Sequence, residues 1–251
     1  MTAAIRIGCS GWVYPDWRGR FYPDYLAEAE WFAHYARVFD TVEINNSFYR
    51  LPTAAAVRHW RAQAPKGFLY AVKANRYITH MKKLREPKPP LRQFLTRMRP
   101  LGPHLGPLLY QLPPNWHCDA GRLRDFVALL PPKLVHVFEF RHPSWLNEEV
   151  FALLDARGAS VCCHDLLDMP RVAVGRIAYV RFHGTLPGYA GGYPAAVLRT
   201  WARWLCEQAK AGRPGFAYFN NDVAAQAVKD AQALRRMVRT SLSRAARGRG
   251  R

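Results

Sequence analysis

The most constraining feature of this 251-residue chain is a series of eight short apolar runs, each followed at once by polar or charged residues. The runs cover residues 5–9, 41–44, 69–72, 107–110, 135–140, 160–163, 177–182 and 215–219. Strands of a parallel sheet are buried on both faces, so they appear in a sequence as unbroken apolar runs. Eight such strands in a chain of this length predict a (β/α)8, or TIM, barrel, whose functional residues lie at the carboxyl ends of the strands.

Segments with helical spacing separate most of these runs. They cover residues 24–38, 53–63, 91–98, 123–130, 148–156, 195–211 and 224–238, and Thr53 is a suitable N-cap for the second. The connection of residues 166–175, between the sixth and seventh runs, is too short for a full crossover helix. We therefore predict an α/β fold with one TIM-barrel domain over residues 1–239. Its shortened crossover would be a loop or a single helical turn.

The chain is strongly basic, with a formal net charge of +19. Residues 235–251 contain seven arginines and no acidic residue, yet the rest of the chain would still carry +12. A positive field favours polyanions such as nucleic acid and phosphorylated metabolites. We predict that residues 240–251 form a basic, disordered tail that adds non-specific affinity for nucleic acid. The alternative is that this tail is only a solvated chain end.

Several features predict a cytoplasmic protein that makes no membrane contact. No apolar run approaches the roughly 18 residues that a membrane-spanning helix needs. The first residues, MTAAI, lack the basic and then apolar order of a signal peptide. The five cysteines are odd in number and show no CxxC spacing, which is typical of reduced thiols.

Charged side chains at the predicted strand ends form the candidate catalytic group. Side chains alternate along a strand with a period of two, so inward-pointing residues from several strands can converge in the barrel mouth. Glu43 and Glu139 are the candidate acid–base pair, and His183 is the candidate for proton transfer. The structural alternative for Glu43 is a salt bridge to Lys73 or Arg181.

A larger set of cationic, amide and aromatic residues around the same strand ends is expected to bind the substrate. The set comprises Trp12, Asn45, Tyr49, Lys73, His80, Gln111, Arg141, His142, Trp145, Arg181, Tyr189, Asn220 and Asp222. Lys73, Arg141 and Arg181 would bind anionic oxygens. The aromatic rings would stack on a sugar or a base, and the other polar residues would orient the ligand. The alternative for the tryptophans is that they close the barrel rim.

A divalent metal is a hypothesis that we favour less. His164, Asp165 and Asp222, together with Glu139 and His183, are residue types that bind Zn²⁺ or Mn²⁺. No compact ligand motif such as HExxH accompanies them. The sequence therefore names no specific metal or other cofactor.

Several motifs resemble those of the bacterial and archaeal DUF72 (YecE-like) family, a domain of unknown function. They are IGCSGW at 7–12, WRGRFYP at 17–23, TVEINNSFYRLP at 41–52, VKA at 72–74 with ITH at 78–80, QLPP at 111–114, EFRHPSW at 139–145, RFHG at 181–184 and YFNND at 218–222. They follow one another through the whole chain except the basic tail, and the one local departure is Cys9, where threonine is expected more often. The resemblance implies a TIM barrel similar to those of sugar isomerases and endonuclease IV. It implies no known activity.

Two functions from different classes fit these features. The first is an enzyme, a hydrolase or an isomerase, that acts on a phosphorylated or polyhydroxylated substrate, or on a nucleic-acid phosphodiester, at the carboxyl end of the barrel. The second is a non-catalytic nucleic-acid-binding protein that uses a basic rim and tail. The expected partner is thus an anionic small molecule or nucleic acid. A deep pocket with converging Glu and Arg residues would favour the enzyme, and a flat basic groove with exposed aromatic residues would favour the binding protein.

Overall fold

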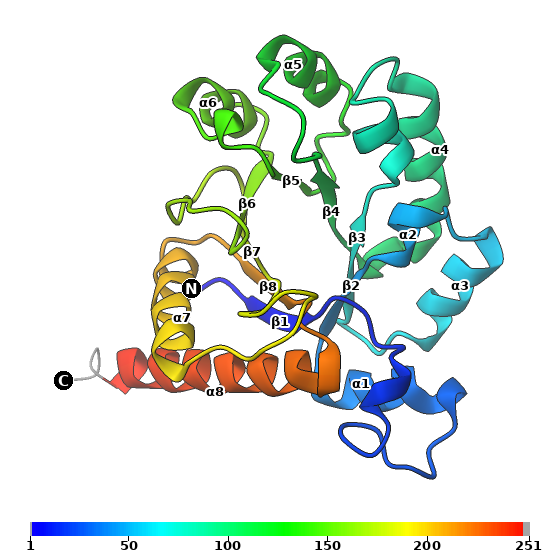
Figure 1. The fold of residues 1–251 in the computed structure, drawn as a ribbon, viewed down its shortest axis with the longest axis vertical. Helices are drawn as coiled ribbons and strands as arrows, with labels where there is room; N and C mark the ends of the chain where they lie inside the picture. Colours follow the sequence, from blue (N-terminus) through cyan, green and yellow to red (C-terminus); the bar gives the residue numbers. More distant parts are fainter. Residues whose placement is uncertain (1, 248–251) are drawn as a thin grey trace.

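The computed structural model describes residues 2–247 and contains one sheet of eight parallel strands wrapped around a central axis (Figure 1). The hydrogen-bonded order is β1-β8-β7-β6-β5-β4-β3-β2, so β1 and β2 are its two ends. The strands are β1 (Ile5–Cys9), β2 (Thr41–Ile44), β3 (Leu69–Lys73), β4 (Leu105–Gln111), β5 (His136–Glu139), β6 (Ser160–His164), β7 (Ala178–Phe182) and β8 (Gly215–Phe219). Each coincides with one of the eight apolar runs, which confirms the TIM-barrel prediction.

Helices surround the barrel, and all seven of the predicted helical segments are present (Figure 1). The helices are α1 (Trp31–Val38), α2 (Asn46–Tyr49), α3 (Ala54–Gln63), α4 (Lys88–Met98), α5 (Ala120–Ala128), α6 (Glu148–Asp155), α7 (Ala195–Lys210) and α8 (Gln226–Arg247). Thr53 caps α3 as expected, because its hydroxyl accepts a hydrogen bond from the amide of Ala56. Helix α1 begins later than predicted, since the chain before it forms turns and the short 3₁₀ helix Glu28–Glu30.

Helix α8 extends further than the sequence pattern indicated. We expected it to end near Val238 and a disordered tail to begin at residue 240, but the helix continues to Arg247. Leu242 is partly buried and packs against the core, so an apolar contact supports the helix beyond Val238. The structure thus gives a helix for residues 240–247 where we expected disorder, and residues 248–251 lie outside the described part of the chain.

The predicted shortened crossover lies between β6 and β7. No helix forms in residues 166–175, and partly buried side chains of this segment, including Val172 and Val174, pack against the core in its place. The segment is fastened at its end, where the Gly175 amide donates to Asp155 Oδ1 at 2.9 Å. Gly175 has a φ of +76°, and an added Cβ would lie 2.1 Å from the Ala159 carbonyl oxygen, so this turn requires glycine.

Side chains join the two ends of the strand order. The amide of Cys9 in β1 donates to the Tyr35 hydroxyl at 2.8 Å, and that hydroxyl donates to the Thr41 carbonyl of β2 at 3.0 Å. Ser10 Oγ also donates to Glu43 Oε1 at 2.8 Å. The close approach needs Gly8, because a Cβ there would meet the Thr41 carbonyl oxygen at 2.3 Å. The α1 tyrosine thus bridges β1 and β2 where a backbone ladder joins the other strands.

Two apolar layers hold the barrel. One fills its interior with residues such as Leu109, Val137 and Tyr179, and the larger one lies between the sheet and the helices. The interior layer closes the barrel below the polar strand ends, so it is a packed core and not a channel. None of the described helices combines the length and the apolar character needed to cross a bilayer. All five cysteines lie in the described part of the chain, and all are free thiols.

Candidate active site

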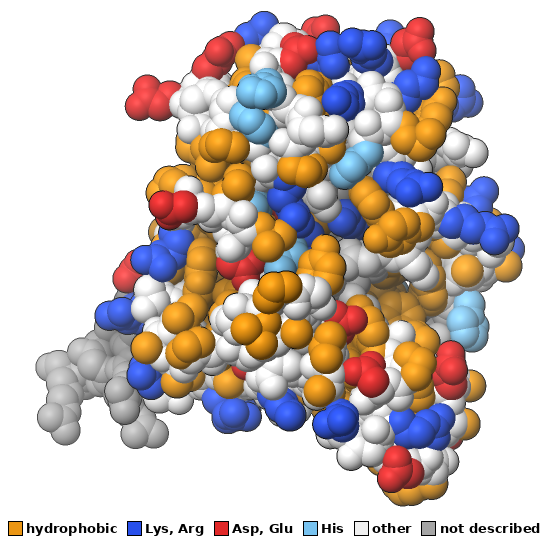
Figure 2. All heavy atoms as spheres, in the orientation of Figure 1, with side chains coloured by type: hydrophobic (Ala, Val, Ile, Leu, Met, Phe, Trp, Pro, Cys, Tyr) orange, Lys and Arg blue, Asp and Glu red, His pale blue; other side chains and the backbone are white. Residues whose placement is uncertain are grey.

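A cavity of about 760 Å³ opens at the carboxyl ends of the strands. It is lined by Tyr14, Asn45, Phe48, Tyr49, Lys73, Arg76, His80, Met81, Gln111, Arg141, Arg181, Tyr189, Asn220 and Asp222. Figure 2, in the orientation of Figure 1, shows Lys and Arg side chains at the centre of this face of the molecule. Ten of the predicted substrate-binding residues belong to this lining, so the structure brings most of that set together.

Four lining residues were absent from the predicted set: Tyr14, Phe48, Arg76 and Met81. All four lie in the connections that follow β1, β2 and β3. In TIM barrels such connections form the walls of the site. Their position after a strand was the available signal, because their residue types alone are common on any protein surface.

A buried ion network centred on Arg181 lies at the base of the cavity. Arg181 donates to Glu43 Oε1 through Nε at 3.0 Å and to Glu139 Oε2 through Nη1 at 2.7 Å. Arg141 pairs with the other carboxylate oxygen of Glu139. Both glutamates are fully buried and are not among the residues that line the cavity. The structure thus contains the Glu43–Arg181 pair that was the structural alternative, and any catalytic role of the two carboxylates stays a prediction.

The protonation state of Glu139 depends on two opposing effects, its burial and the positive charges next to it. Burial by itself would raise the pKa of this carboxyl, but the neighbouring guanidinium groups of Arg181 and Arg141 outweigh burial and hold the pKa well below its usual value. Glu43 has further donors, since it accepts hydrogen bonds from Tyr179 Oη at 2.5 Å as well as from Ser10. The two carboxylates are therefore held by fixed partners and orient Arg181 and Arg141.

His183 also lies below the cavity surface. Its Nδ1 and Asp165 Oδ1 are 2.8 Å apart, and its Nε2 is 3.1 Å from Nη2 of Arg141. A guanidinium has no lone pair to offer, so Nε2 must accept and Nδ1 must carry the proton that it donates to Asp165. Burial lowers the pKa of His183 to about 4, so the ring is neutral at pH 7. It therefore orients Arg141, and its predicted proton transfer is not tested by this arrangement.

Lys73 is the most unusual ionisable group of the cavity. It ends β3, the residue is 9% exposed, and its Nζ lies 4.2 Å from the centre of the Phe48 ring. Burial, together with the nearby Arg181, lowers the pKa of Lys73 to about 7. His80 packs edge-on against the same ring, with 4.9 Å between ring centroids, and burial lowers its pKa to about 4. A neutral imidazole and a readily deprotonated amine therefore flank Phe48.

Three predicted substrate-binding residues, Trp12, His142 and Trp145, do not line this cavity. Trp145 is fully buried, stacks on Phe140 and donates from Nε1 to the Trp116 carbonyl at 2.7 Å, so it cannot stack on a ligand. His142 accepts a hydrogen bond from the Ser144 amide and caps the turn after β5. Trp12 packs on neighbouring aromatic rings and lines a smaller cavity of about 170 Å³, which shares Tyr14 and Asn45 with the main cavity.

The candidate metal ligands are not gathered into one site. Within residues 2–247, no three His, Cys, Asp or Glu side chains are placed so that they could hold a metal ion together. Asp165 binds His183 and Tyr193, while His164 Nε2 lies 2.7 Å from the Phe140 carbonyl. Asp222 is the one candidate of this set that lines the cavity, and burial raises the pKa of its carboxyl. We therefore assign no metal ligands.

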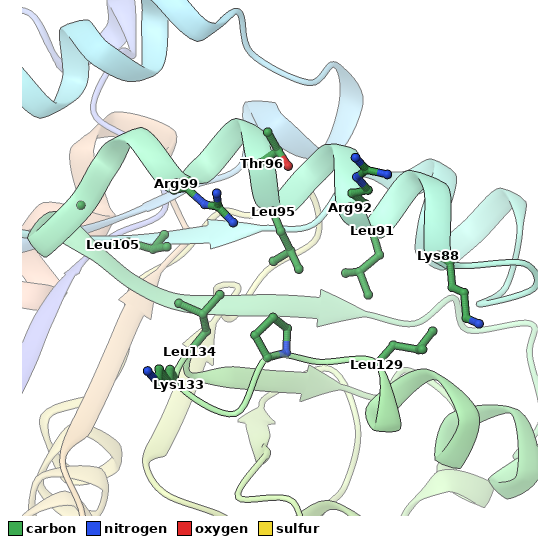
Figure 3. A pocket seen from close by; sticks show the side chains of 12 residues that line it. Lys88, Leu91, Arg92, Leu95, Thr96, Arg99, Leu105, Leu129, Lys133 and Leu134 are labelled. Atoms are coloured by element: carbon green, nitrogen blue, oxygen red, sulfur yellow. The ribbon is translucent and has the colours of Figure 1, made fainter.

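A second hollow, of about 680 Å³, lies on the outside of the barrel between α4 and the chain that enters β5 (Figure 3). Leucine side chains such as Leu91, Leu95 and Leu134 form its walls, and Lys88 and Arg92 are at its rim. It contains no carboxylate or imidazole among the described residues that line it. The cavity at the barrel mouth, which has a carboxylate and an imidazole on its wall, is therefore the candidate active site.

Comparison with known proteins identifies relatives over the whole barrel. The family model described as "Protein of unknown function DUF72" matches residues 6–249. The UPF0759 protein YecE of Escherichia coli K12 is 34% identical over 142 residues, which cover 56% of this chain and 50% of YecE. The match therefore spans half the length of that relative. The UPF0759 protein YunF of Bacillus subtilis 168 is 24% identical over 92% of this chain and 93% of YunF.

Solved structures agree with the observed architecture. A DUF72 family protein from Thermotoga maritima superimposes with a TM-score of 0.85 at 25% identity, covering 94% of this chain and 99% of the other. A DUF72 family protein from Enterococcus faecalis gives a TM-score of 0.80 at 16% identity, with 94% and 95% coverage. The second likeness concerns the fold alone.

Proposed function

This chain belongs to the DUF72 family, and from that membership and the cavity at its barrel mouth we propose that it is an enzyme acting on an anionic small molecule. The substrate would be a phosphorylated or polyhydroxylated compound, and the reaction a hydrolysis or an isomerisation. Enzymes with this fold work at the carboxyl ends of the strands, where the cavity lies. The family description itself names no activity, so the proposal rests on the chemistry of the site.

One observation carries the proposal: basic side chains far outnumber acidic ones on the cavity wall. Lys73, Arg76, Arg141 and Arg181 line the cavity, whereas Asp222 supplies the single carboxylate among its described lining residues. Guanidinium groups present several donors in a plane and bind phosphate or carboxylate oxygens through paired hydrogen bonds. Glu43 and Glu139 offset the charges of Arg181 and Arg141, so the charge offered to an anion comes mainly from Arg76 and Lys73, with the two guanidinium groups of the cavity wall as further donors.

Amide side chains on the cavity wall can form hydrogen bonds with the hydroxyl groups of a substrate. Asn45 Nδ2 donates to Asn220 Oδ1 at 3.3 Å, and Gln111 lies on the neighbouring wall. The Oδ1 atom of Asn45 is buried and accepts no hydrogen bond from the described residues. Buried acceptors without a partner are rare and destabilising. This buried atom is not open to the cavity, so the support for a polyhydroxylated ligand comes from the amide groups of Asn45, Asn220 and Gln111, which line the cavity and can pair with hydroxyl groups.

The alternative is a non-catalytic nucleic-acid-binding protein. Its support is the net charge of +19 together with the arginine-rich end of α8. The site itself favours the enzyme, because cationic, amide and aromatic side chains converge on one cavity of about 760 Å³. A phosphodiester remains within the proposed substrate class, since the same cations suit its oxygens.

Binding of anions tests the proposal. We expect inorganic phosphate and sugar phosphates to raise the melting temperature of the protein, and unphosphorylated sugars to raise it less. Arg76→Gln should weaken phosphate binding by about tenfold to a hundredfold, because a hydrogen bond to a charged group contributes about 1.5–3 kcal/mol. The matched control is Arg85→Gln, in the same connection but not on the cavity wall. Equal binding by all three proteins, or none by the wild type, would contradict an anion site in this cavity.

A further inference from the structure

Lys73 is set apart from the other cations of the cavity by its lack of an acidic partner. The carboxylates nearest in the site, Glu43 and Glu139, are bound by Arg181 and Arg141. Among the described side chains, no carboxylate lies within salt-bridge distance of the Lys73 amine, which rests against the face of the Phe48 ring. Buried ammonium groups are normally paired. The site thus holds an amine whose charged form has the face of an aromatic ring but no carboxylate to stabilise it, and whose side chain lines the cavity.

These surroundings make the amine available at neutral pH. With a pKa of about 7, roughly half of Lys73 is the neutral amine at pH 7. An ordinary lysine, with a pKa near 10.4, has a neutral share that is about a thousandfold smaller. The neutral form carries the lone pair that attacks electrophiles, and desolvated lysines of this kind act as nucleophiles toward carbonyl groups.

We propose that Lys73 forms an imine with the carbonyl group of an anionic aldehyde or ketone that binds in this cavity. This inference rests on the proposed function, since the cavity cations would hold the anionic end of the substrate. It narrows the substrate class to carbonyl compounds that carry phosphate or another anionic group. It also gives Lys73 a covalent role in place of the oxygen-binding role predicted from the sequence.

The step balances without an oxidant or a reductant. The lone pair of Nζ forms a bond to the carbonyl carbon, and a proton passes from the nitrogen to the oxygen to give a carbinolamine. The nitrogen then forms its second bond to the carbon and loses its other proton, while the hydroxyl group leaves as water. One amine and one carbonyl group therefore give one imine and one water molecule.

His80 is placed to carry protons in this sequence. It shares the Phe48 ring with Lys73, and its low pKa keeps it neutral at pH 7. The hydroxyl of Thr79 lies 2.9 Å from His80 Nδ1, which leaves Nε2 as the second nitrogen that can exchange a proton. The arrangement supplies a nucleophile and a proton carrier on one side of the cavity.

Pyridoxal 5′-phosphate is a suitable probe because it combines an aldehyde with a phosphate. The full chain is incubated with the probe at pH 7, the imine is reduced with borohydride, and the labelled peptides are mapped by mass spectrometry. The chain has eight lysines, so the position can be assigned directly. We expect the label on Lys73, reduced by competing inorganic phosphate. Pyridoxal without the phosphate should also label it less, but its free hydroxyl closes a hemiacetal on the aldehyde, so competition by phosphate is the measurement that reports the anion site.

Two variants serve as controls for the label. One keeps a positive charge at position 73 without the amine, and the other removes a different lysine. Lys73→Arg keeps the positive charge but cannot form an imine, so it should lose the label and still be stabilised by phosphate. Lys66→Met removes an exposed lysine away from the cavity and should be labelled at Lys73 like the wild type. The wild-type map alone decides the outcome if Lys73→Arg does not fold.

The results distinguish this inference from the proposed function. Stabilisation by phosphate with label on other lysines and none on Lys73 would overturn the imine and leave the anion site intact. No stabilisation and no specific label would contradict both. Label on Lys73 that phosphate does not reduce would contradict the anionic substrate class, and with it the inference as stated.

Discussion

At the scale of single residues, the buried carboxylate of Glu139 makes two ion pairs that its amide analogue cannot make. Glu139→Gln leaves the fully buried Arg181 with one acidic partner instead of two, and it removes the carboxylate that pairs with Arg141. Breaking a buried ion pair from one side typically destabilises a protein by about 3–5 kcal/mol. We expect Glu139→Gln to lower the free energy of unfolding by that amount at pH 7, measured by urea denaturation.

The pH dependence of this difference follows from the pKa of Glu139, which is lower in the folded protein than its ordinary value. Its contribution is complete above the unfolded pKa of about 4.3 and is lost as the pH falls below it. The gap between wild type and variant should therefore narrow in acid. Glu207→Gln, on the exposed side of α7, is the control and should change stability by less than about 0.5 kcal/mol. A Glu139→Gln variant as stable as this control would mean that the ion network adds nothing to the fold.

The sequence predicted the face of the sheet on which these side chains lie, but not how far below the barrel mouth they lie. The alternation of side chains correctly placed Glu43, Lys73, Glu139 and Arg181 on the inner side of the barrel. Depth depends on strand register: Glu43 pairs with Ala71, so Lys73 lies two residues nearer the mouth. Register is set by packing of distant segments, and the same is true of Trp145, whose burial depends on a contact with Trp116.

At the scale of elements, the junction of β1 and β2 depends on the hydroxyl of Tyr35. Tyr35→Phe keeps the ring in the core but leaves the Cys9 amide and the Thr41 carbonyl without a partner. Each unsatisfied buried group costs about 1–3 kcal/mol. We expect Tyr35→Phe to lose about 2–4 kcal/mol of stability and to speed hydrogen exchange at the Cys9 amide. Tyr25→Phe, at an 89% exposed position, should change neither.

The elements themselves were largely predictable, since buried parallel strands produce apolar runs whose ends differ from the observed strands by at most two residues. The connection without a helix was also predictable, because its length excludes one. The end of α8 was not, since the apolar period fades after Val238 and only Leu242 continues it. The bridge through Tyr35 could not be inferred either, because it joins three segments that meet only in the folded chain.

At the scale of the whole molecule, the net charge of +19 predicts non-specific affinity for nucleic acid that depends on salt. Deletion of residues 244–251 removes four arginines but keeps Leu242, the last residue known to pack on the core. Each phosphate that an arginine neutralises on duplex DNA contributes about 0.9 to the slope of log affinity against log salt. We expect the magnitude of the slope to fall by up to about 3–4 when binding is measured from low to moderate salt.

A full-length variant with the same four arginines changed to glutamine separates charge from chain length. Its slope of log affinity against log salt should equal that of the truncated protein if the arginines act through charge. An unchanged slope in both would show that the end of the chain does not contribute and that any binding comes from the barrel.

The order of the strands also has a consequence for the synthesis of this chain. Of the eight barrel strands, β1 leaves the ribosome before the others, yet its backbone partner is β8, and Ile5 pairs with Gly215. At a translation rate of about 5–20 residues per second, β1 waits roughly 10–40 seconds for that partner. During this interval its apolar side chains, such as Ile7, have no final place in a core. The barrel can therefore close only after β8 has been synthesised. Until then the apolar side chains of β1 are exposed and offer a binding site for chaperones.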